Sequence, residues 1–286
     1  MTTILACIDG SRYTDSVCEH SAWAANRMDA EVELVHIHDH HAAEGMDFDL
    51  SGSLGASEQE SLLEELTELD AQRGRLAQKR GRLILDEAKA RVTNAGVERV
   101  STHQRQGVFV DTVIELEEHV DLVVLGKRGE SAKSTISPHL GGNLERVVRA
   151  STKPVLVASR AFQPINRFLI AFDGGPSVQR AIDYISTTPL LAGIECRLLM
   201  VDNDNDSNRR ELADAAAPLI SAGFSVDTVI KPGHADDVIA ADVAEHGIDM
   251  IVMGAFGHSR IRTLIIGSTT TATLQRCRIP VLMFRA

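Results

Sequence analysis

Five residues between positions 254 and 269 have types and a spacing that suit them to hold phosphate groups. Gly254 and Gly257 are separated by two residues, nine residues separate Gly257 from Gly267, and Ser268 and Thr269 follow directly. Glycine lets backbone amides approach an anion closely, and a helix that starts after Gly267 would direct unpaired N–H groups toward it. We therefore predict that the two glycine positions hold a polyphosphate from both sides.

The elements that would position these glycines occur twice in the chain. The apolar run Ile4–Asp9 resembles the run Phe168–Asp173, and each ends in an aspartate followed by glycine. Gly141 to Pro154 spans 13 residues, as does Gly267 to Pro280. Several equal spacings are less expected by chance than similar apolar residues in two strands. The pattern therefore indicates a tandem repeat of one structural unit. We expect domains at residues 1–160 and 161–286.

Each copy alternates apolar runs with segments of helical periodicity. In the first copy an apolar run at 2–9 precedes a helical pattern at 12–29 and a second β pattern at 31–37. This alternation predicts an α/β fold, a doubly wound parallel sheet of five strands in each copy. With strand order 3-2-1-4-5, the ligand crevice of the second copy lies between the strands that end at Asp173 and Gly254.

The motif G-x2-G-x9-G-[S/T], the aspartate after the first strand and the Pro-Val-Leu last strand resemble those of universal stress proteins, specifically their ATP-binding branch. The resemblance covers both copies and implies a tandem, cytoplasmic protein that regulates stress responses. It also implies that the copies pair through residues 154–159 and 280–284, as the subunits of a universal stress protein dimer do. A further homodimer stays open.

Carried over residue by residue, the resemblance implies an ATP site in the second copy. Whether Mg²⁺ accompanies the phosphates stays open. Adenine would lie near Ala171, Asp173 and Val201, with the Asp173 carboxylate able to accept from the ribose hydroxyls. The implied phosphate-binding residues are Met253, Gly254, Gly257, Gly267, Ser268 and Thr269. His258 and Arg260 lie on the intervening loop and could add charge. The alternative is that these glycines only form turns.

The first copy departs from the motif. Eleven residues, not nine, separate Gly129 from Gly141, and glycine replaces the hydroxyl residue that follows. Asp9 and Gly126 are retained at the ends of their strands. These changes leave open whether this copy binds nucleotide, binds another ligand or only supports the second copy.

Two other function classes remain as alternatives. One is a weak ATPase or self-phosphorylating enzyme, although the sequence contains no GxxxxGK[ST], GxSxG or HExxH motif and no evident general base. The other is a metal or small-molecule carrier that uses the first copy, where His36, His38, His40 and His41 crowd the end of a strand. The acidic run 202–206 resembles the start of a calcium loop but lacks its later glycine and glutamate, so a helix-capping loop is favoured.

Composition restricts the partners. Lys and Arg total 29 against 40 Asp and Glu, a formal net charge of −11 at pH 7, which disfavours nucleic acid and anionic membranes. No apolar run approaches the roughly 20 residues of a membrane span. The four cysteines form no Cys-x-x-Cys pair, which fits a reducing cytoplasm.

Residues 58–93 have the composition of a long helix. Its apolar positions predict one stripe that faces the core, and part of the helix is expected to project as a surface or partner helix. Residues 71–82, where charge dominates, are expected to be solvated. The predicted stripe consists of Leu62, Leu66, Leu69, Leu76, Leu83 and Ile84.

Overall fold

The structure is a computed structural model that describes residues 1–38, 56–127, 142–255 and 268–285, with only the backbone described at 56–61, 268 and 269. Its strands form one ten-stranded sheet in the order β3-β2-β1-β4-β5-β10-β9-β6-β7-β8. The first copy supplies β1 (Thr3–Cys7), β2 (Glu31–His38), β3 (Val100–Gln106), β4 (Leu122–Gly126) and β5 (Val155–Ala158). The second supplies β6 (Arg167–Phe172), β7 (Glu195–Val201), β8 (Val226–Lys231), β9 (Met250–Gly254) and β10 (Val281–Phe284).

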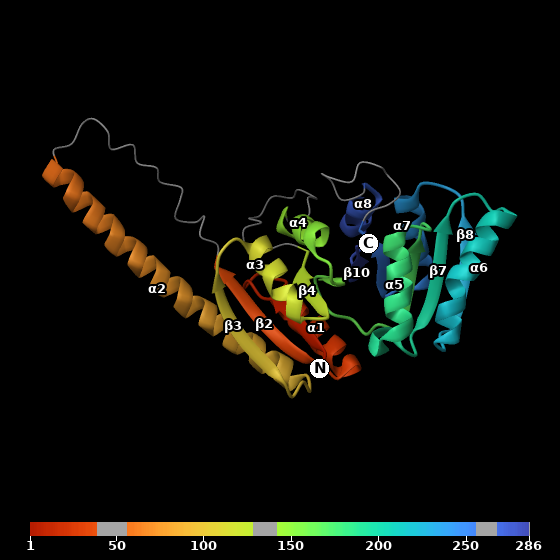
Figure 1. The fold of residues 1–286 in the computed structure, drawn as a ribbon, viewed down its shortest axis with the longest axis horizontal. Coiled ribbons are helices and arrows are strands. Elements are labelled where there is room, and N and C mark those ends of the chain that lie inside the picture. Colours follow the sequence, from red (N-terminus) through yellow and green to blue (C-terminus); the bar gives the residue numbers. More distant parts are fainter. Residues whose placement is uncertain (39–55, 128–141, 256–267, 286) are drawn as a thin grey trace.

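Helices alternate with these strands in both copies (Figure 1). The first copy contains α1 (Thr14–Met28), α2 (Ala56–Asn94), α3 (Phe109–Leu116), the 3-10 turn η2 (Glu117–His119) and α4 (Gly142–Ala150). The second contains α5 (Pro176–Thr187), the 3-10 turn η3 (Pro189–Leu191), α6 (Asp206–Ser221), α7 (Ala235–His246) and α8 (Ser268–Arg276). α2 and α6 end just before glycines, Gly96 and Gly223, whose positive φ angles of 94° and 90° stop a helix.

Each copy has the doubly wound order 3-2-1-4-5, which confirms the predicted fold class. In the first copy β1 pairs in parallel with both β2 and β4, and in the second copy β6 pairs in parallel with β7 and β9. The order therefore reverses beside β1 and again beside β6. These two reversal points define where a ligand crevice can form in each copy.

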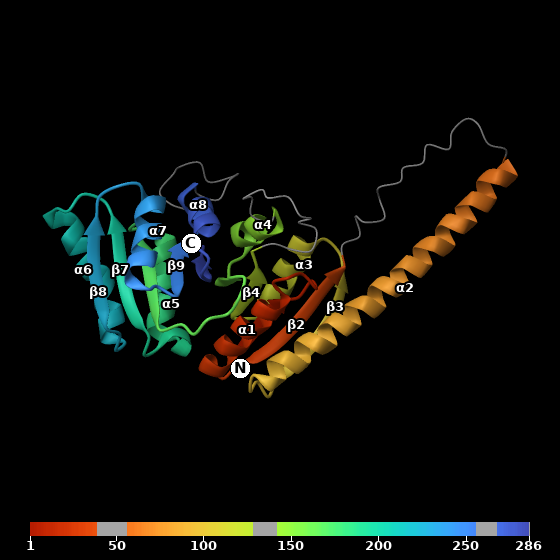
Figure 2. The same ribbon diagram turned by 180° about the vertical axis from the view of Figure 1, so that it is seen from behind.

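The two copies meet through their last strands, as the resemblance implied. β5 and β10 run antiparallel, with Leu156 opposite Leu282, and this is the junction that joins the two parallel halves. Figures 1 and 2 show the halves side by side from opposite directions. Pairing these strands leaves β3 and β8 as the outer edges of the sheet.

The core consists of two apolar layers, one on each face of the sheet. Successive strand residues alternate between them, so Ile4 and Ala6 belong to one layer while Leu5 and Cys7 belong to the other. The first layer receives α1, α2, α5 and α6, and the second receives α3, α4, α7 and α8. We call these the α1/α5 face and the α4/α8 face.

The prediction that one leucine stripe of α2 faces the core is wrong. Leu69, Leu76 and Leu83 are exposed, and only Ile84 packs against the core. Among residues 62–94 of α2, whose burial the structure describes, the buried positions are Gly81, Leu85, Ala88 and Val92. The reason is that α2 has 39 residues and its first part extends past the sheet, where no strand lies beneath it (Figures 1 and 2). Within the predicted solvated stretch 71–82, residues 71–80 and Arg82 are exposed, as predicted, but Gly81 is buried because it packs against β2 and β3.

Candidate functional site

The carboxyl ends of β6 and β9 bring together apolar residues of the predicted site. Ala171 in β6 is the register partner of Met253 in β9, and Val201 ends the adjacent strand β7. All three side chains lie on the α4/α8 face. Met253 is buried, whereas Ala171 and Val201 are half-buried. The site therefore has an apolar floor that is partly open.

A tight turn positions the acidic residue of the predicted site. Asp173 directly follows β6 and is exposed. Its Oδ1 accepts a hydrogen bond of 2.9 Å from the backbone N–H of Gly175. Gly174, between them, has a φ of 70°, which glycine adopts without strain. The turn holds the carboxylate at the rim of the apolar floor.

The first turn of α8 lies beside the end of β9. The helix begins at Ser268, and the Thr270 hydroxyl donates a hydrogen bond of 3.4 Å to the carbonyl oxygen of Gly254. The unpaired N–H groups of a helix start favour anions, so this end of the site suits phosphate. Four predicted residues of this region lie outside the described residues: Gly257, His258, Arg260 and Gly267.

The first copy repeats part of this geometry. Asp9 Oδ1 accepts a hydrogen bond of 2.9 Å from the Ser11 N–H, and Gly10 has a φ of 74°. α4 begins at Gly142, as α8 begins at Ser268. Gly126 ends β4, and Gly129 and Gly141 lie outside the described residues.

The long helix α2 makes the two aspartate turns different. A Cβ atom built on Gly10 would lie 2.7 Å from Cδ1 of Ile84, so α2 packs directly on the turn of the first copy. Counted back from Gly96 and Gly223, the equivalent position in α6 is Glu211, which is exposed. The first copy, which departs from the glycine motif, therefore also differs in that α2 packs against its aspartate turn.

His36 and His38 lie next to each other on the α1/α5 face, opposite the face that carries the candidate site. Their rings meet edge to face with centroids 4.5 Å apart, and His36 Nδ1 contacts the Ile8 carbonyl oxygen at 2.7 Å. Burial, and then the neighbouring His36, lower the pKa of His38. The predicted metal site stays a prediction because His40 and His41 lie outside the described residues.

The acidic run after β7 is a helix cap, as favoured from the sequence. Asn205 is the N-cap of α6, and its Oδ1 accepts hydrogen bonds from the N–H groups of Ser207 and Asn208. Asp204 pairs with Arg209. Asp204, the third position of the calcium-loop pattern, is therefore already paired with a cation.

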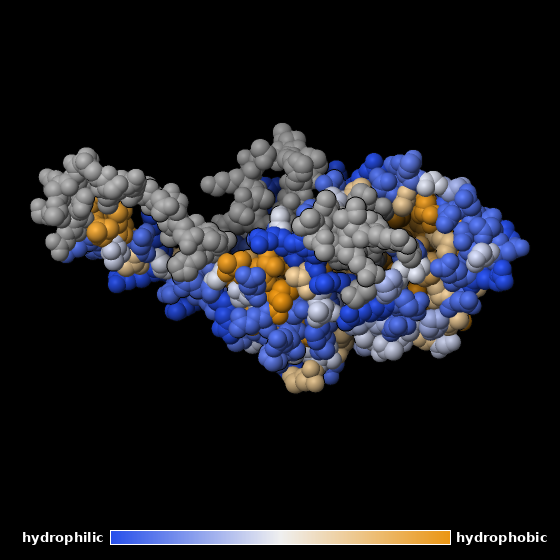
Figure 3. Space-filling model, turned by 45° about the horizontal axis from the view of Figure 1, so that its top comes forward, coloured by the Kyte–Doolittle hydropathy of each residue, from blue (hydrophilic) through white to orange (hydrophobic). Residues whose placement is uncertain are grey.

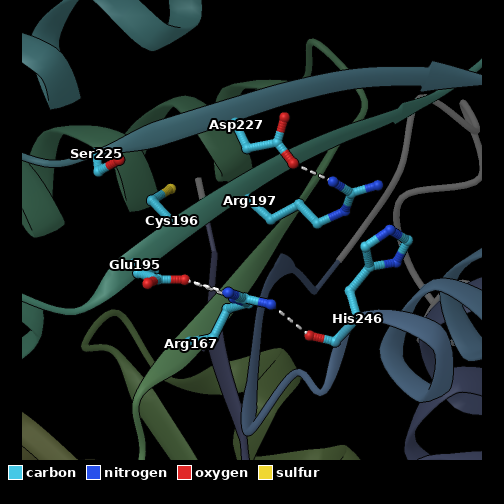
Figure 4. A pocket seen from close by; sticks show the side chains of 7 residues that line it. All are labelled: Arg167, Glu195, Cys196, Arg197, Ser225, Asp227 and His246. Carbon is cyan, nitrogen blue, oxygen red and sulfur yellow. Dashed lines mark hydrogen bonds and ion pairs between the residues drawn. The ribbon is translucent and has the colours of Figure 1, made fainter.

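A pocket lies at the opposite, amino-terminal ends of the strands in the second copy (Figure 4). Arg167 and Glu195, the first residues of β6 and β7, face each other across it and form an ion pair. The pocket is lined by Arg167, Glu195, Cys196, Arg197, Ser225, Asp227 and His246. It is separate from the candidate site at the carboxyl ends.

Beside this pocket lies a buried ion pair that the sequence reasoning missed. Arg197 Nε donates to Asp242 Oδ2 at 2.6 Å, and Lys231 Nζ lies 2.8 Å from Asp242 Oδ1. Among the described residues, Asp242, Glu245 and His246 lie close enough to share a metal ion. Because two cations already neutralise Asp242, we interpret the group as structural. The available signal was Arg197, a charged residue that follows Cys196 and precedes the apolar run 198–201 in β7.

A search of the described residues finds no helix that is both long and apolar enough to cross a membrane.

Comparison with known proteins identifies the family. The model of the universal stress protein family matches residues 1–159 and again 164–285. The chain is 35% identical over 288 residues to universal stress protein Slr1230 of Synechocystis, with all of both chains covered. A universal stress protein from Archaeoglobus fulgidus superposes with a TM-score of 0.69 at 20% identity, covering 99% of this chain and 96% of that one.

A functionally unknown protein from Pseudomonas aeruginosa PAO1 has the same fold, with a TM-score of 0.62 at 16% identity over 100% of this chain and 92% of that one. Each copy has its own complete strand order and its own match to the family model. The chain therefore belongs to the universal stress protein family and is a tandem member of it.

Proposed function

We propose that the second copy binds ATP at the carboxyl ends of β6 and β9, and that the protein is a cytoplasmic, nucleotide-dependent regulator of a stress response. One observation carries the proposal: the start of α8 lies against the end of β9, at the position where the sequence has the glycine motif of the ATP-binding branch. A helix start flanked by glycines is suited to bind phosphate.

The described residues fit the other parts of ATP. The half-buried Ala171 and Val201 form an apolar surface suited to a purine ring. The exposed Asp173 carboxylate lies at its rim, where it can accept hydrogen bonds from ribose hydroxyls. A Mg²⁺ ion bound to the phosphates would neutralise part of their charge.

The repeat supplies a matched test in the full-length protein. Asp173→Asn keeps an oxygen that can accept from the Gly175 N–H but removes the charge, so we expect calorimetry to show ATP binding weakened about tenfold or more. Asp9→Asn makes the same change in the equivalent turn and should leave the affinity unaltered. Failure of the wild type to bind ATP, with or without Mg²⁺, would refute the proposal, and equal losses in both variants would refute the assignment to the second copy.

A turnover assay separates a binding protein from an enzyme. We expect bound ATP to be recovered intact after long incubation. Phosphate release above that of a Gly267→Leu variant would instead support the ATPase alternative.

A further inference from the structure

The first part of α2, residues 56–80, projects from the body of the protein as an arm (Figures 1 and 2). Residues 71–80 are all exposed. Large apolar side chains are exposed there too: Leu69 is 49% and Leu76 is 67% exposed. Figure 3 shows hydrophobic atoms near the outer end of this arm. Such side chains on a projecting helix indicate a surface that a partner covers.

Leucines of the arm and of the helical turn that follows it have the seven-residue spacing of a coiled coil. Leu62, Leu69, Leu76 and Leu83 are seven residues apart, and Leu66 lies four residues after the first of them. The seven-residue spacing places four of them at one of the two core positions of a heptad, and Leu66 occupies the other core position, which Arg73 and Arg80 occupy in the next two heptads. We call these five leucines the leucine edge.

Charge is divided sharply along the same arm. Residues 62–70 contain four acidic residues and no basic one, whereas residues 71–82 contain five basic residues and no acidic one. The acidic residues are Glu64, Glu65, Glu68 and Asp70, and the basic residues are Arg73, Arg75, Lys79, Arg80 and Arg82.

A solitary arm with this sequence is disfavoured. Gly74 and Gly81 each cost a helix about 1 kcal/mol relative to alanine. Like charges four residues apart, as in Glu64–Glu68 and Arg75–Lys79, repel along the helix. An exposed helix has no tertiary packing to offset these costs. A partner helix with the opposite order of charge would offset them.

We propose that the arm forms an antiparallel two-helix coiled coil with the arm of a second copy of this chain. In this orientation the acidic part of each arm faces the basic part of the other, whereas a parallel pair would place like charges together. Pairing centred on Ala71 places Leu66 opposite Leu76 of the second copy, and it leaves Glu65 and Lys79 of the second copy only about 3 Å apart along the axis. One sequence thus supplies both halves of a self-complementary, two-fold interface.

The geometry of the chain permits this pairing. Residues 62–83 span about 33 Å of helix, and among the described residues the body packs against α2 only at the carboxyl-terminal part of the helix. An antiparallel pair therefore places the two bodies at opposite ends of the coiled coil. The β5–β10 junction lies within each chain and is not used.

The first test is the mass of the full-length protein in solution. We expect light scattering to give twice the chain mass of 31.0 kDa. Leu69→Glu combined with Leu76→Glu should raise the dimer dissociation constant by more than about tenfold. The control is Ile220→Glu, which changes an exposed apolar residue of the equivalent helix α6 and should leave the dimer intact.

The second test is the orientation of the helices. With a short bismaleimide cross-linker, Glu65→Cys and Lys79→Cys should cross-link the two copies when combined in one chain, but neither should do so alone. In the proposed pairing the two copies of residue 65 lie about 18 Å apart along the axis. The native cysteines are all buried, so the introduced thiols react preferentially.

Three outcomes would overturn the proposal. A monomeric wild type would mean that something other than a second copy covers the leucine edge. A dimer unaffected by the double leucine variant would place the interface elsewhere. Cross-linking of Glu65→Cys alone would mean that the helices run parallel.

Discussion

Asp242 is a fully buried carboxylate with two cationic partners. Burial alone would raise its pKa, but hydrogen bonds from Arg197 and Lys231 hold the pKa of Asp242 below its usual range. Arg197 also pairs with the exposed Asp227. Three elements, β7, β8 and α7, are thereby joined around one carboxylate.

Asp242→Asn should lower the free energy of unfolding by about 3 kcal/mol near neutral pH, because it leaves buried cationic charge without its partner. The depressed pKa means that this contribution is present above the unfolded value of about 3.9 and is lost as the pH falls through the folded value. Urea unfolding at several pH values should therefore show the difference from wild type shrinking below about pH 4. A difference that does not vary with pH would contradict this account. Asp204→Asn, at an exposed pair, is the control and should have much less effect.

At the scale of elements, α2 and α6 are equivalent helices with different environments. Both pack on the α1/α5 face and end at a glycine. Only α2 continues past the sheet, and it contains glycines in both parts. A Cβ on Gly74 would meet nothing within 4 Å. A Cβ on Gly81 would lie 2.6 Å from His36 Cδ2 and 2.8 Å from Gln104 Nε2.

These two glycines predict opposite results for the same substitution. Gly74→Ala should stabilise the arm by about 1 kcal/mol, because alanine favours the helix and space is available. Gly81→Ala should destabilise the protein by about 1 to 3 kcal/mol, because His36 cannot move away without weakening its contact with Ile8. Hydrogen exchange across α2 measures the effect of Gly74→Ala on the arm, and thermal unfolding measures the effect of Gly81→Ala on the whole protein. Stabilisation by Gly81→Ala would show that the helix is not tightly packed there.

At the scale of the whole molecule, the two copies are held together by more than the β5–β10 pair. Arg27 of α1 donates to the carbonyl oxygens of Leu190 and Ala192. Lys127, which follows β4, donates to the Cys277 carbonyl oxygen at 2.5 Å and is buried. Burial lowers the pKa of Lys127 to about 8. Lys127 of the first copy is therefore buried against backbone carbonyl groups of the second copy.

Lys127 should give stability a specific pH dependence. Its unfolded pKa is about 10.4, so between pH 8 and about 10 the unfolded chain binds a proton that the folded protein has released, and stability rises with pH. Comparison of wild type with Lys127→Met by chemical unfolding isolates this effect. We expect the difference to move in favour of wild type as the pH rises through this range. A constant difference would show that Lys127 stays protonated in the folded protein.

The sequence by itself determined the fold class, the tandem repeat and the strands whose ends form the candidate site. Apolar runs and helical periodicity are local patterns, and the second copy repeated them at equal offsets. The motif between Gly254 and Thr269 likewise depends only on short spacings. These features needed no knowledge of which distant residues meet.

Only the tertiary structure decided how distant residues meet. Arg197 and Asp242 are 45 residues apart and Lys127 and Cys277 are 150 apart, so their contacts depend on how strands and helices pack. The leucines of α2 looked like a core stripe because helical spacing does not reveal where the sheet ends. Beneath the first part of α2 there is no sheet, and the same leucines are left exposed for a partner.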